Sequence, residues 1–361
     1  MNDSIQSLDA ASENLARLLA AVEVESDAGF RLGGRRFSLQ DPGLPSAASG
    51  VAPFVDRLTW VLYRYVYSHA WSGTLDDEPE QGETPQQAAE RRRARLTPDE
   101  DLLGRLSAAN PTSERWEHGW TIAQILPSGQ IQAQRGHLQR LVWPGQFLSK
   151  DGPGAQHRVG AQISLFYSKE SVALQPGFYY MFGETPEEQS HAYGIMRLYW
   201  NVEPSGAPPL LGVVGRTLNR YQVPFRMKCA VALPEYERTD VAVLYLPKSM
   251  TRFVFSLLPD LYDQVRDHVG DEVPFFSRKL APGLSLAEDP GTGESFGQHR
   301  CRLVAEAVWN CFLHQDERPE TRLAELRRLF ADNRVHPDHC HMNADSREWY
   351  ELPEVIDERA A

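Results

Sequence analysis

The sequence contains few cysteines and no long apolar run. Its 361 residues include Cys229, Cys301, Cys311 and Cys340, which show no paired spacing. Two of them lie in apolar or amphipathic stretches, which favours reduced thiols and a cytoplasmic protein over a disulfide framework. No run of about 18 apolar residues occurs, so no membrane-spanning segment is expected. The first residues also lack the basic and apolar regions of a signal peptide.

The signatures of nucleotide enzymes and of zinc metalloproteases are missing as well. No GxxxxGK[ST] loop occurs, and no GxGxxG motif lies between a strand and a helix. The HRC at residues 299–301 is not the HRD loop of a kinase, and no DFG accompanies it. The HExxH pair is absent too. The chain is therefore not expected to transfer phosphate from a nucleotide.

Positive charge is scarce and unevenly distributed. The net charge of -12 argues against general binding to DNA or RNA, whose backbones attract basic surfaces. Lysine occurs only at positions 150, 169, 228, 248 and 279, whereas arginine is abundant. With 42% hydrophobic and 24% charged residues, the composition is that of a globular protein with a sizeable core.

Hydrophobic periodicity predicts helices, then strands, then a mixture of both. Helices are expected over residues 3–24, 51–71 and 97–109, the last with Thr97 as its N-cap, and a short hairpin over 29–39. Residues 72–95 form an exposed polar segment whose second half is helical. Short alternating runs over 116–202 indicate antiparallel strands. Further strands are expected over 223–231 and 241–246, and helices over 208–219, 250–268, 297–313 and 320–330.

This order of elements predicts an α+β fold, with N-terminal helices, a mostly antiparallel sheet, and C-terminal helices packed on it. We divide the chain into a mostly helical region 1–110, an α+β core 111–335 and a polar tail 336–361. The tail contains His336, His339, Cys340 and His341, whose side chains are suited to zinc. They lack a second pair at the usual spacing, so a surface segment without metal is preferred.

A cationic cluster lies between residues 221 and 302 of this acidic chain. In a strand, Arg226 and Lys228 project on one face, and Phe225, Met227 and Cys229 on the other. Two adjacent cations repel each other unless an anion joins them. A neighbouring cation also disfavours the charged form of a lysine, so a lysine placed in this way can act as a general base. Arginine binds phosphate oxygens with its planar fork.

Spacing alone favours a simpler alternative, in which Arg226 and Lys228 form ion pairs with nearby acids. Glu235, Glu237 and Asp240 are the candidates. Further along the chain, His299 and Arg302 lie three residues apart, near one face of an expected helix, and Arg300 points elsewhere.

Four segments of the sequence resemble the HopA-type effector family. They are YQVPFRMK, YERTDVAVLY, KLAPGLSLAEDP and ESFGQHRCRLVAEA, and the likeness is close from about residue 194 to residue 307. Members of this family also occur in thioamitide and class V lanthipeptide biosynthesis. There the resemblance implies a phosphoserine/phosphothreonine lyase that works with a separate kinase on a precursor peptide. Such a lyase converts phosphoserine to dehydroalanine and phosphothreonine to dehydrobutyrine.

The chemistry of this elimination gives roles to the cationic residues. A base must remove the α-proton, positive charge must hold the phosphate, and a further group must stabilise the enolate. We assign Lys228 as the base and His299 as the acid on the leaving oxygen, although Lys228 and Lys279 could exchange roles. The residues around the phosphate are Arg226, Lys279, Arg302 and Arg300. Those that could bind or orient the substrate are Tyr236, Arg238, Asp240, Glu294, Arg197 and Asn201.

The resulting hypothesis is a cytoplasmic lyase acting on a phosphorylated peptide. No metal or organic cofactor is expected, because the adjacent amide carbonyl acidifies the α-proton and phosphate is a good leaving group. A kinase is the expected partner, and neither nucleic acid nor a membrane is. The alternative is a non-enzymatic protein, either a secreted effector or a module that presents the peptide to another enzyme. For Tyr236 a purely structural turn role is equally compatible with the sequence.

Overall fold

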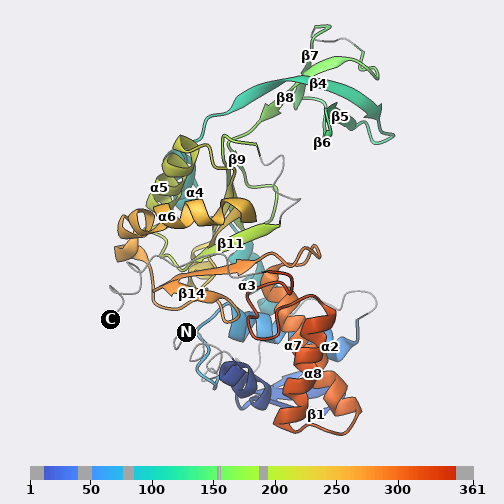
Figure 1. The fold of residues 1–361 in the computed structure, drawn as a ribbon, viewed down its shortest axis with the longest axis vertical. Helices are drawn as coiled ribbons and strands as arrows, with labels where there is room; N and C mark the ends of the chain where they lie inside the picture. Colours follow the sequence, from blue (N-terminus) through green and yellow to red (C-terminus); the bar gives the residue numbers. More distant parts are fainter. Residues whose placement is uncertain are drawn as a thin grey trace.

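The computed structural model describes residues 12–39, 51–75, 85–152, 154, 156–186 and 194–346. Across these residues three antiparallel sheets combine with helices, which confirms the expected α+β class (Figure 1). The helices with defined bounds are α2 (Pro53–Leu62), α3 (Pro85–Leu96), α4 (Glu100–Ala109), α5 (Ala207–Arg220), α6 (Thr251–Asp263), α7 (Phe296–Leu313) and α8 (Pro319–Asp332). Short helical turns are η1 (Tyr63–Tyr67), η3 (Leu233–Glu237), η4 (Lys248–Met250) and η5 (Arg266–His268).

A seven-stranded antiparallel sheet forms the centre of the protein. Its strands run in the order β14-β15-β11-β13-β12-β10-β9, so strands distant in sequence are neighbours in space. Their bounds are β9 (Glu170–Ser171), β10 (Phe178–Phe182), β11 (Ile195–Trp200), β12 (Arg226–Ala230), β13 (Ala242–Pro247), β14 (Arg278–Ala281) and β15 (Leu284–Glu288).

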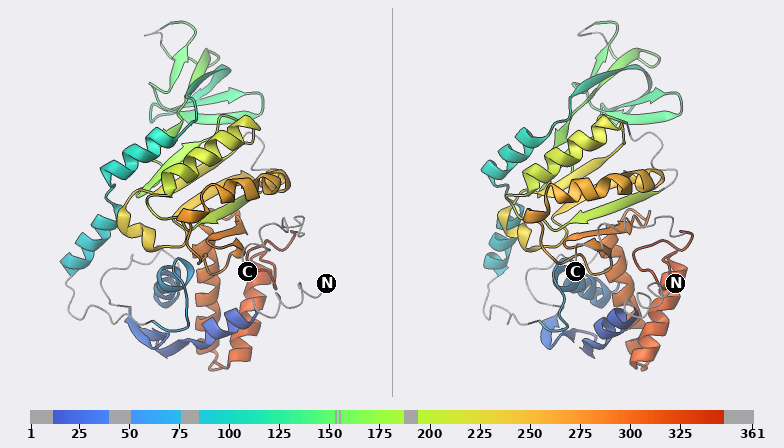
Figure 2. Two further views of the ribbon diagram at one scale, coloured as in Figure 1. Left: turned by 90° about the vertical axis from the view of Figure 1, so that its left-hand side faces the viewer. Right: turned by 60° about the vertical axis from the view of Figure 1, so that its left-hand side comes forward.

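One face of this sheet is apolar and lies against α4, α5 and α6 (Figure 2). Met227, Leu198 and Leu244 are fully buried there, in one cluster with Leu210 of α5 and Leu258 of α6. Because successive residues of a strand point to opposite faces, the residues on either side of each of these three project from the other face of the sheet.

The opposite face is covered over only part of its width. Tyr199, Val243 and Ala287 share a hydrophobic cluster with Leu58 of α2 and Val304 of α7. This cluster covers the sheet over β15, β11 and β13. Over β12 and β10 the same face carries the half-buried Arg226 and Lys228 and the buried Tyr180, and we call this part the polar face.

The N-terminal region differs from the expected single helix over residues 3–24. Helix is present at residues 12–20, and β1 (Val22–Ser26) follows directly. Val22 and Val24 favour a strand because β-branched residues pack well on a pleated surface. The hairpin expected over 29–39 is confirmed as β2 (Gly29–Leu32) and β3 (Arg35–Ser38), and β1 pairs with β2. Residues 3–11 lie outside the described chain.

A five-stranded sheet lies at one end of the molecule, at the top of Figure 1. It has the order β6-β5-β4-β8-β7 and its own small cluster around Trp120 and Ile163. Its strands are β4 (Arg115–Ile125), β5 (Ile131–Arg135), β6 (Leu138–Val142), β7 (Phe147–Ser149) and β8 (Gln162–Tyr167). The expected antiparallel strands in this region are confirmed.

Two helix boundaries differ from expectation. The N-cap of α4 is Asp99 rather than Thr97, because the Asp99 carboxylate accepts a hydrogen bond from the Leu102 amide at 2.8 Å. The Thr97 hydroxyl instead donates to the Arg93 carbonyl at the end of α3. Helix α6 ends at Asp263, and the expected helix over 250–268 is completed by η5, with Val265 between the two buried in the core.

The hydrophobic clusters do not follow the three expected regions. Leu18 and Phe30 from the first region pack in one cluster with Val304 and Phe330 from the C-terminal helices. Residues 336–346 of the expected tail also pack on the protein, since Met342 is buried and the Glu288 amide donates to the His341 carbonyl. Residues 347–361 lie outside the described chain. Within the described ranges, no helix is both long and apolar enough to cross a bilayer.

Candidate functional site

Arg226 and Lys228 lie on the polar face, as their alternation predicts. Both are half-buried, whereas Met227 between them is fully buried. Arg226 is opposite Tyr245 of β13, and Lys228 is opposite Tyr180 of β10. The two cations are therefore neighbours on β12, and both project from the polar face.

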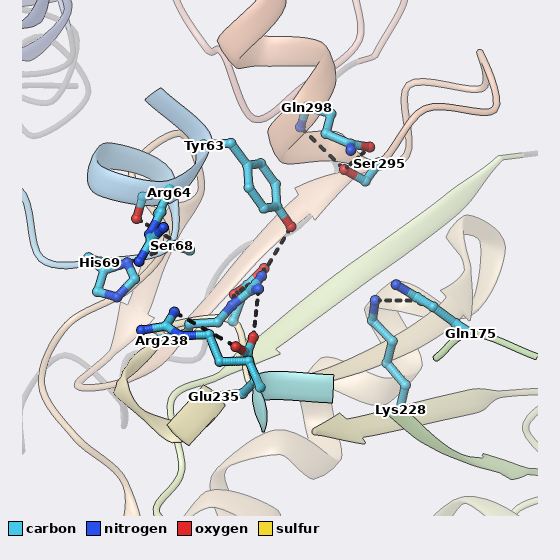
Figure 3. A network of polar contacts seen from close by, with 12 residues as sticks. Tyr63, Arg64, Ser68, His69, Gln175, Lys228, Glu235, Arg238, Ser295 and Gln298 are labelled. Carbon is cyan, nitrogen blue, oxygen red and sulfur yellow. Dashed lines mark hydrogen bonds and ion pairs between the residues drawn. The ribbon is translucent and has the colours of Figure 1, made fainter. Parts of the chain in front are cut away.

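Lys228 is held by neutral groups. Its Nζ donates a hydrogen bond of 3.2 Å to Oε1 of Gln175 and lies 4.0 Å from the centre of the Phe178 ring. Tyr180 donates to the same Gln175 oxygen at 2.8 Å. Figure 3 shows Lys228 beside Gln175, on the same side of the sheet as Tyr63 and the first turn of α7 at Ser295 and Gln298.

Arg226 is also held by an aromatic ring. Its guanidinium lies 4.8 Å from the centre of the Tyr245 ring, and Arg197 approaches the same ring at 5.4 Å. Arg197 is paired with the Asp289 carboxylate, to which its Nε donates at 3.0 Å. Among the described residues, neither Arg226 nor Lys228 forms an ion pair with a carboxylate.

The alternative in which Arg226 and Lys228 pair with nearby acids is wrong. Asp240 and Glu235 accept hydrogen bonds from Arg238, at 2.8–3.0 Å. Glu235 and Glu237 also lie within 3.7–3.8 Å of the Arg95 guanidinium of α3. Sequence spacing could not show this, because Arg95 lies far from these acids along the chain.

Arg238 joins the turn after β12 to the helical layer. Besides its two acids, it donates to the Tyr63 hydroxyl of η1 at 3.1 Å, as the centre of Figure 3 shows. Arg238 and Asp240 are thus brought close to the polar face, but their polar groups bind each other. The Tyr236 hydroxyl donates to the Ala230 carbonyl at 2.9 Å, in agreement with a structural turn role.

Lys279 is not part of the same site as Lys228. It lies exposed on β14, and β15, β11 and β13 separate it from β12. Four steps between adjacent strands correspond to about 19 Å. The two lysines therefore cannot bind one phosphate or exchange roles on one substrate, and the sequence-based grouping is corrected. Asn201, at the end of β11, donates instead to the Glu272 carbonyl at 3.0 Å.

His299 and Arg300 are inside the protein. Neither side chain is exposed, and Arg300 Nη1 donates to His299 Nδ1 at 2.6 Å. Burial, followed by the charge of Arg300, lowers the pKa of His299 to about 4. A neutral, enclosed imidazole does not meet the requirements of an acid on a leaving phosphate. Arg300 cannot reach a phosphate either, because its Nε donates to the Cys340 carbonyl and its guanidinium lies over Phe296.

Arg302 is already bound to two carboxylates. It donates to both oxygens of Glu294 at 2.9 Å and to Glu306 at 2.7 Å. Arg302 and Glu294, predicted as a phosphate ligand and an orienting acid, are thus paired with each other. The structure brings together Arg226, Lys228 and Arg197 from the sequence-based set.

The sequence analysis missed Tyr180, Gln175 and Tyr245 as neighbours of the two cations. Alternation within residues 178–182 indicates that Tyr179 and Tyr180 point to opposite faces of the sheet. It does not show that Tyr180 lies opposite Lys228, because the register between β10 and β12 depends on tertiary pairing. Burial raises the pKa of the Tyr180 hydroxyl, with a further contribution from Tyr245. Tyr180 therefore keeps its proton at neutral pH.

Within the described ranges, no group of three or more His, Cys, Asp or Glu side chains is arranged to hold a metal ion. Of the C-terminal histidines, His341 is buried, and burial followed by Arg278 lowers its pKa to about 3. All four cysteines are free thiols.

Comparison with known proteins gives a family match over the central sheet. Residues 169–342 match the HopA1 effector protein family. The matched region begins at the edge strand β9 and contains the polar face, α7 and α8. No curated protein matches the chain.

Two solved structures of effector proteins from Pseudomonas syringae are similar to this chain. The protein from pv. tomato strain DC3000 has 23% sequence identity and a TM-score of 0.38, over 48% of this chain and 66% of the other. The protein from pv. syringae strain 61 has 15% identity and a TM-score of 0.41, over 79% of this chain and 88% of the other.

Proposed function

We propose that the protein is a phosphoserine/phosphothreonine lyase that converts phosphorylated residues of a precursor peptide to dehydroalanine or dehydrobutyrine. The observation that carries the proposal is the pair Arg226 and Lys228, two adjacent cations on the polar face without a carboxylate partner among the described residues. Such a pair favours a dianionic ligand. The HopA1 family match supports the proposal, because it covers the segments that carry the resemblance to these lyases.

The proposed reaction is an elimination across the Cα–Cβ bond. The Lys228 amine removes the α-proton, the electron pair forms the Cα=Cβ bond, and the Cβ–O bond breaks to release phosphate. Arg226 binds the phosphate oxygens, and its position over Tyr245 orients the guanidinium toward the polar face. Gln175 fixes the Lys228 amine, since it accepts the Lys228 hydrogen bond.

Tyr180 replaces His299 in this mechanism. Its hydroxyl lies on the same face as Lys228 and shares the Gln175 oxygen. Because it remains protonated, its O–H can turn from Gln175 and donate a hydrogen bond to the departing oxygen or to the substrate carbonyl as negative charge develops there. A separate kinase supplies the phosphorylated substrate, since the sequence contains no kinase motifs.

Incubation of the protein with a phosphoserine peptide, followed by mass spectrometry, tests the proposal. We expect loss of phosphoric acid, and Lys228→Ala lowers the rate by about a hundredfold or more, the usual contribution of a general base. Lys150→Ala, at an exposed position of the five-stranded sheet, is the matched control. We expect Lys279→Ala to keep the wild-type rate, because three strands separate Lys279 from Lys228.

Binding without turnover would instead support the non-enzymatic alternative. A phosphopeptide that binds, stays intact with the kinase present, and binds equally well to Lys228→Ala would contradict the lyase proposal.

A further inference from the structure

A cavity of about 350 Å³ lies at the junction between the five-stranded and the seven-stranded sheet. The five-stranded sheet contributes Arg115, Arg140 and Tyr167 to its wall. The seven-stranded sheet contributes Phe182 and Arg226, which pair with each other across β10 and β12. This volume is within the range of small-ligand sites and is enough for one or two side chains.

The wall of this cavity is positively charged. It includes three arginines and no aspartate or glutamate, although the whole chain has a net charge of -12. Arg115 is held over the Tyr167 ring at 4.9 Å and is paired with Glu117 at 3.2 Å. Arg140 is exposed, and Arg226 has no carboxylate partner among the described residues. Guanidinium groups above aromatic and aliphatic walls are suited to an acidic side chain with its methylene stem.

Arg226 connects the cavity with Lys228. The two residues are separated by one position on β12, so they lie about 7 Å apart along the strand. An extended peptide rises about 3.3 Å per residue. When its phosphorylated residue lies at Lys228, a residue two to four positions away therefore reaches the cavity.

We infer that this cavity is a subsite for an acidic residue of the substrate peptide, two to four positions from the residue that loses phosphate. The inference rests on the proposed lyase function. It specifies which substrate peptides the enzyme prefers, namely those with an acidic residue near the phosphorylated one. The recognised group is an anion, either the carboxylate of Glu or Asp or a second phosphate. Arg115 and Arg140 bind this anion, which leaves Arg226 for the phosphate that is eliminated and Lys228 for the reaction.

A set of phosphoserine peptides with one Glu at each position from four before to four after the phosphoserine tests this inference. Each is compared with the peptide that has Gln at the same place, and a further set carries a second phosphoserine. Elimination is measured as kcat/KM by mass spectrometry, and binding as Kd by fluorescence anisotropy. On one side of the phosphoserine we expect Glu to exceed Gln in kcat/KM by about tenfold, as for one charged hydrogen bond. A larger effect of the second phosphoserine would identify phosphate as the preferred anion.

Arg140→Gln is the decisive variant, because the Arg140 side chain is exposed and the core does not depend on it. We expect the Glu-to-Gln ratio to fall to near one in this variant. Arg158→Gln, a change of the same kind at an exposed arginine outside the cavity, keeps the wild-type ratio. A ratio near one at every position in the wild type, or an undiminished ratio in Arg140→Gln, overturns the inference.

The two proposals fail separately. If no peptide undergoes elimination, the lyase function fails. The anisotropy measurement still decides on the subsite, since the preference of binding for Glu over Gln and its loss in Arg140→Gln do not require turnover.

Discussion

At the scale of single residues, His299 and His341 are buried imidazoles with depressed pKa values. Burial is the main cause for both, and the values fall from 6.5 to about 4 for His299 and to about 3 for His341. Between the folded and unfolded pKa values, the unfolded chain binds more protons than the folded protein. Folding stability is therefore greatest above about pH 6.5 and is lost as the pH falls toward 4.

We predict that the free energy of unfolding decreases by about 1.4 kcal/mol per pH unit for each of these histidines below pH 6.5. Denaturant unfolding at several pH values between 5 and 7 measures this slope. His299→Gln keeps an acceptor for Arg300 but does not titrate. The free energy of unfolding of this variant therefore changes less steeply with pH, by about 1.4 kcal/mol per pH unit, the effect of one proton. Equal slopes for the wild type and His299→Gln would contradict the explanation.

The sequence predicted the common face of Arg226 and Lys228, because strand alternation is a local property. It did not predict their partners. Glu235 and Asp240 bind Arg238, only a few residues away, whereas Arg95 comes from a helix more than a hundred residues earlier. His299 was assigned as an acid from its residue type, its spacing from Arg302 and the chemistry that the family resemblance implies, whereas its burial depends on packing that spacing does not encode.

At the scale of elements, the start of α4 depends on one side chain. Asp99 accepts a hydrogen bond from the Leu102 amide, and Glu100 and Asp101 add negative charge in the first turn. This negative charge stabilises the positive end of the helix dipole. The T-P-D-E sequence predicted a helix start here, but only the geometry shows which of its residues is the cap.

We predict that Asp99→Ala lowers the free energy of unfolding by about 1 kcal/mol, through loss of the cap. Thr97→Ala, two residues earlier, changes it much less because Thr97 is exposed and does not bind the first turn of α4. Guanidinium unfolding of both variants measures the difference. Equal losses would show that Asp99 does not act as the cap.

At the scale of the whole molecule, the two larger sheets have very different cores. The five-stranded sheet has a small cluster around Trp120, whereas the seven-stranded sheet is buried on its apolar face and partly on the other. Less buried apolar surface means a smaller free energy for local opening.

We predict that the amides of β4, β5 and β8 exchange with solvent deuterium through a local opening, at lower denaturant concentrations than the amides of β11 and β13. Native-state hydrogen exchange followed by mass spectrometry distinguishes the two groups. A single common opening free energy would show that the sheets unfold as one unit.

The order of strands in the central sheet could not be predicted from sequence. Short apolar runs show that strands exist, but β11 lies between β13 and β15, strands far from it along the chain. The sequence also could not show that one hydrophobic cluster takes residues from both ends of the chain, and the division into three regions stays a prediction.

The contact between the two ends of the chain also affects how the protein is made. Arg322 of α8 donates to the carbonyls of Leu19 and Val22, across 303 and 300 residues. At a ribosomal rate of roughly 5–20 residues per second, Arg322 is synthesised on the order of half a minute after Leu19 and Val22. During translation the early hairpin therefore emerges long before the helix that completes its core, and this closure is expected to be among the last steps of folding.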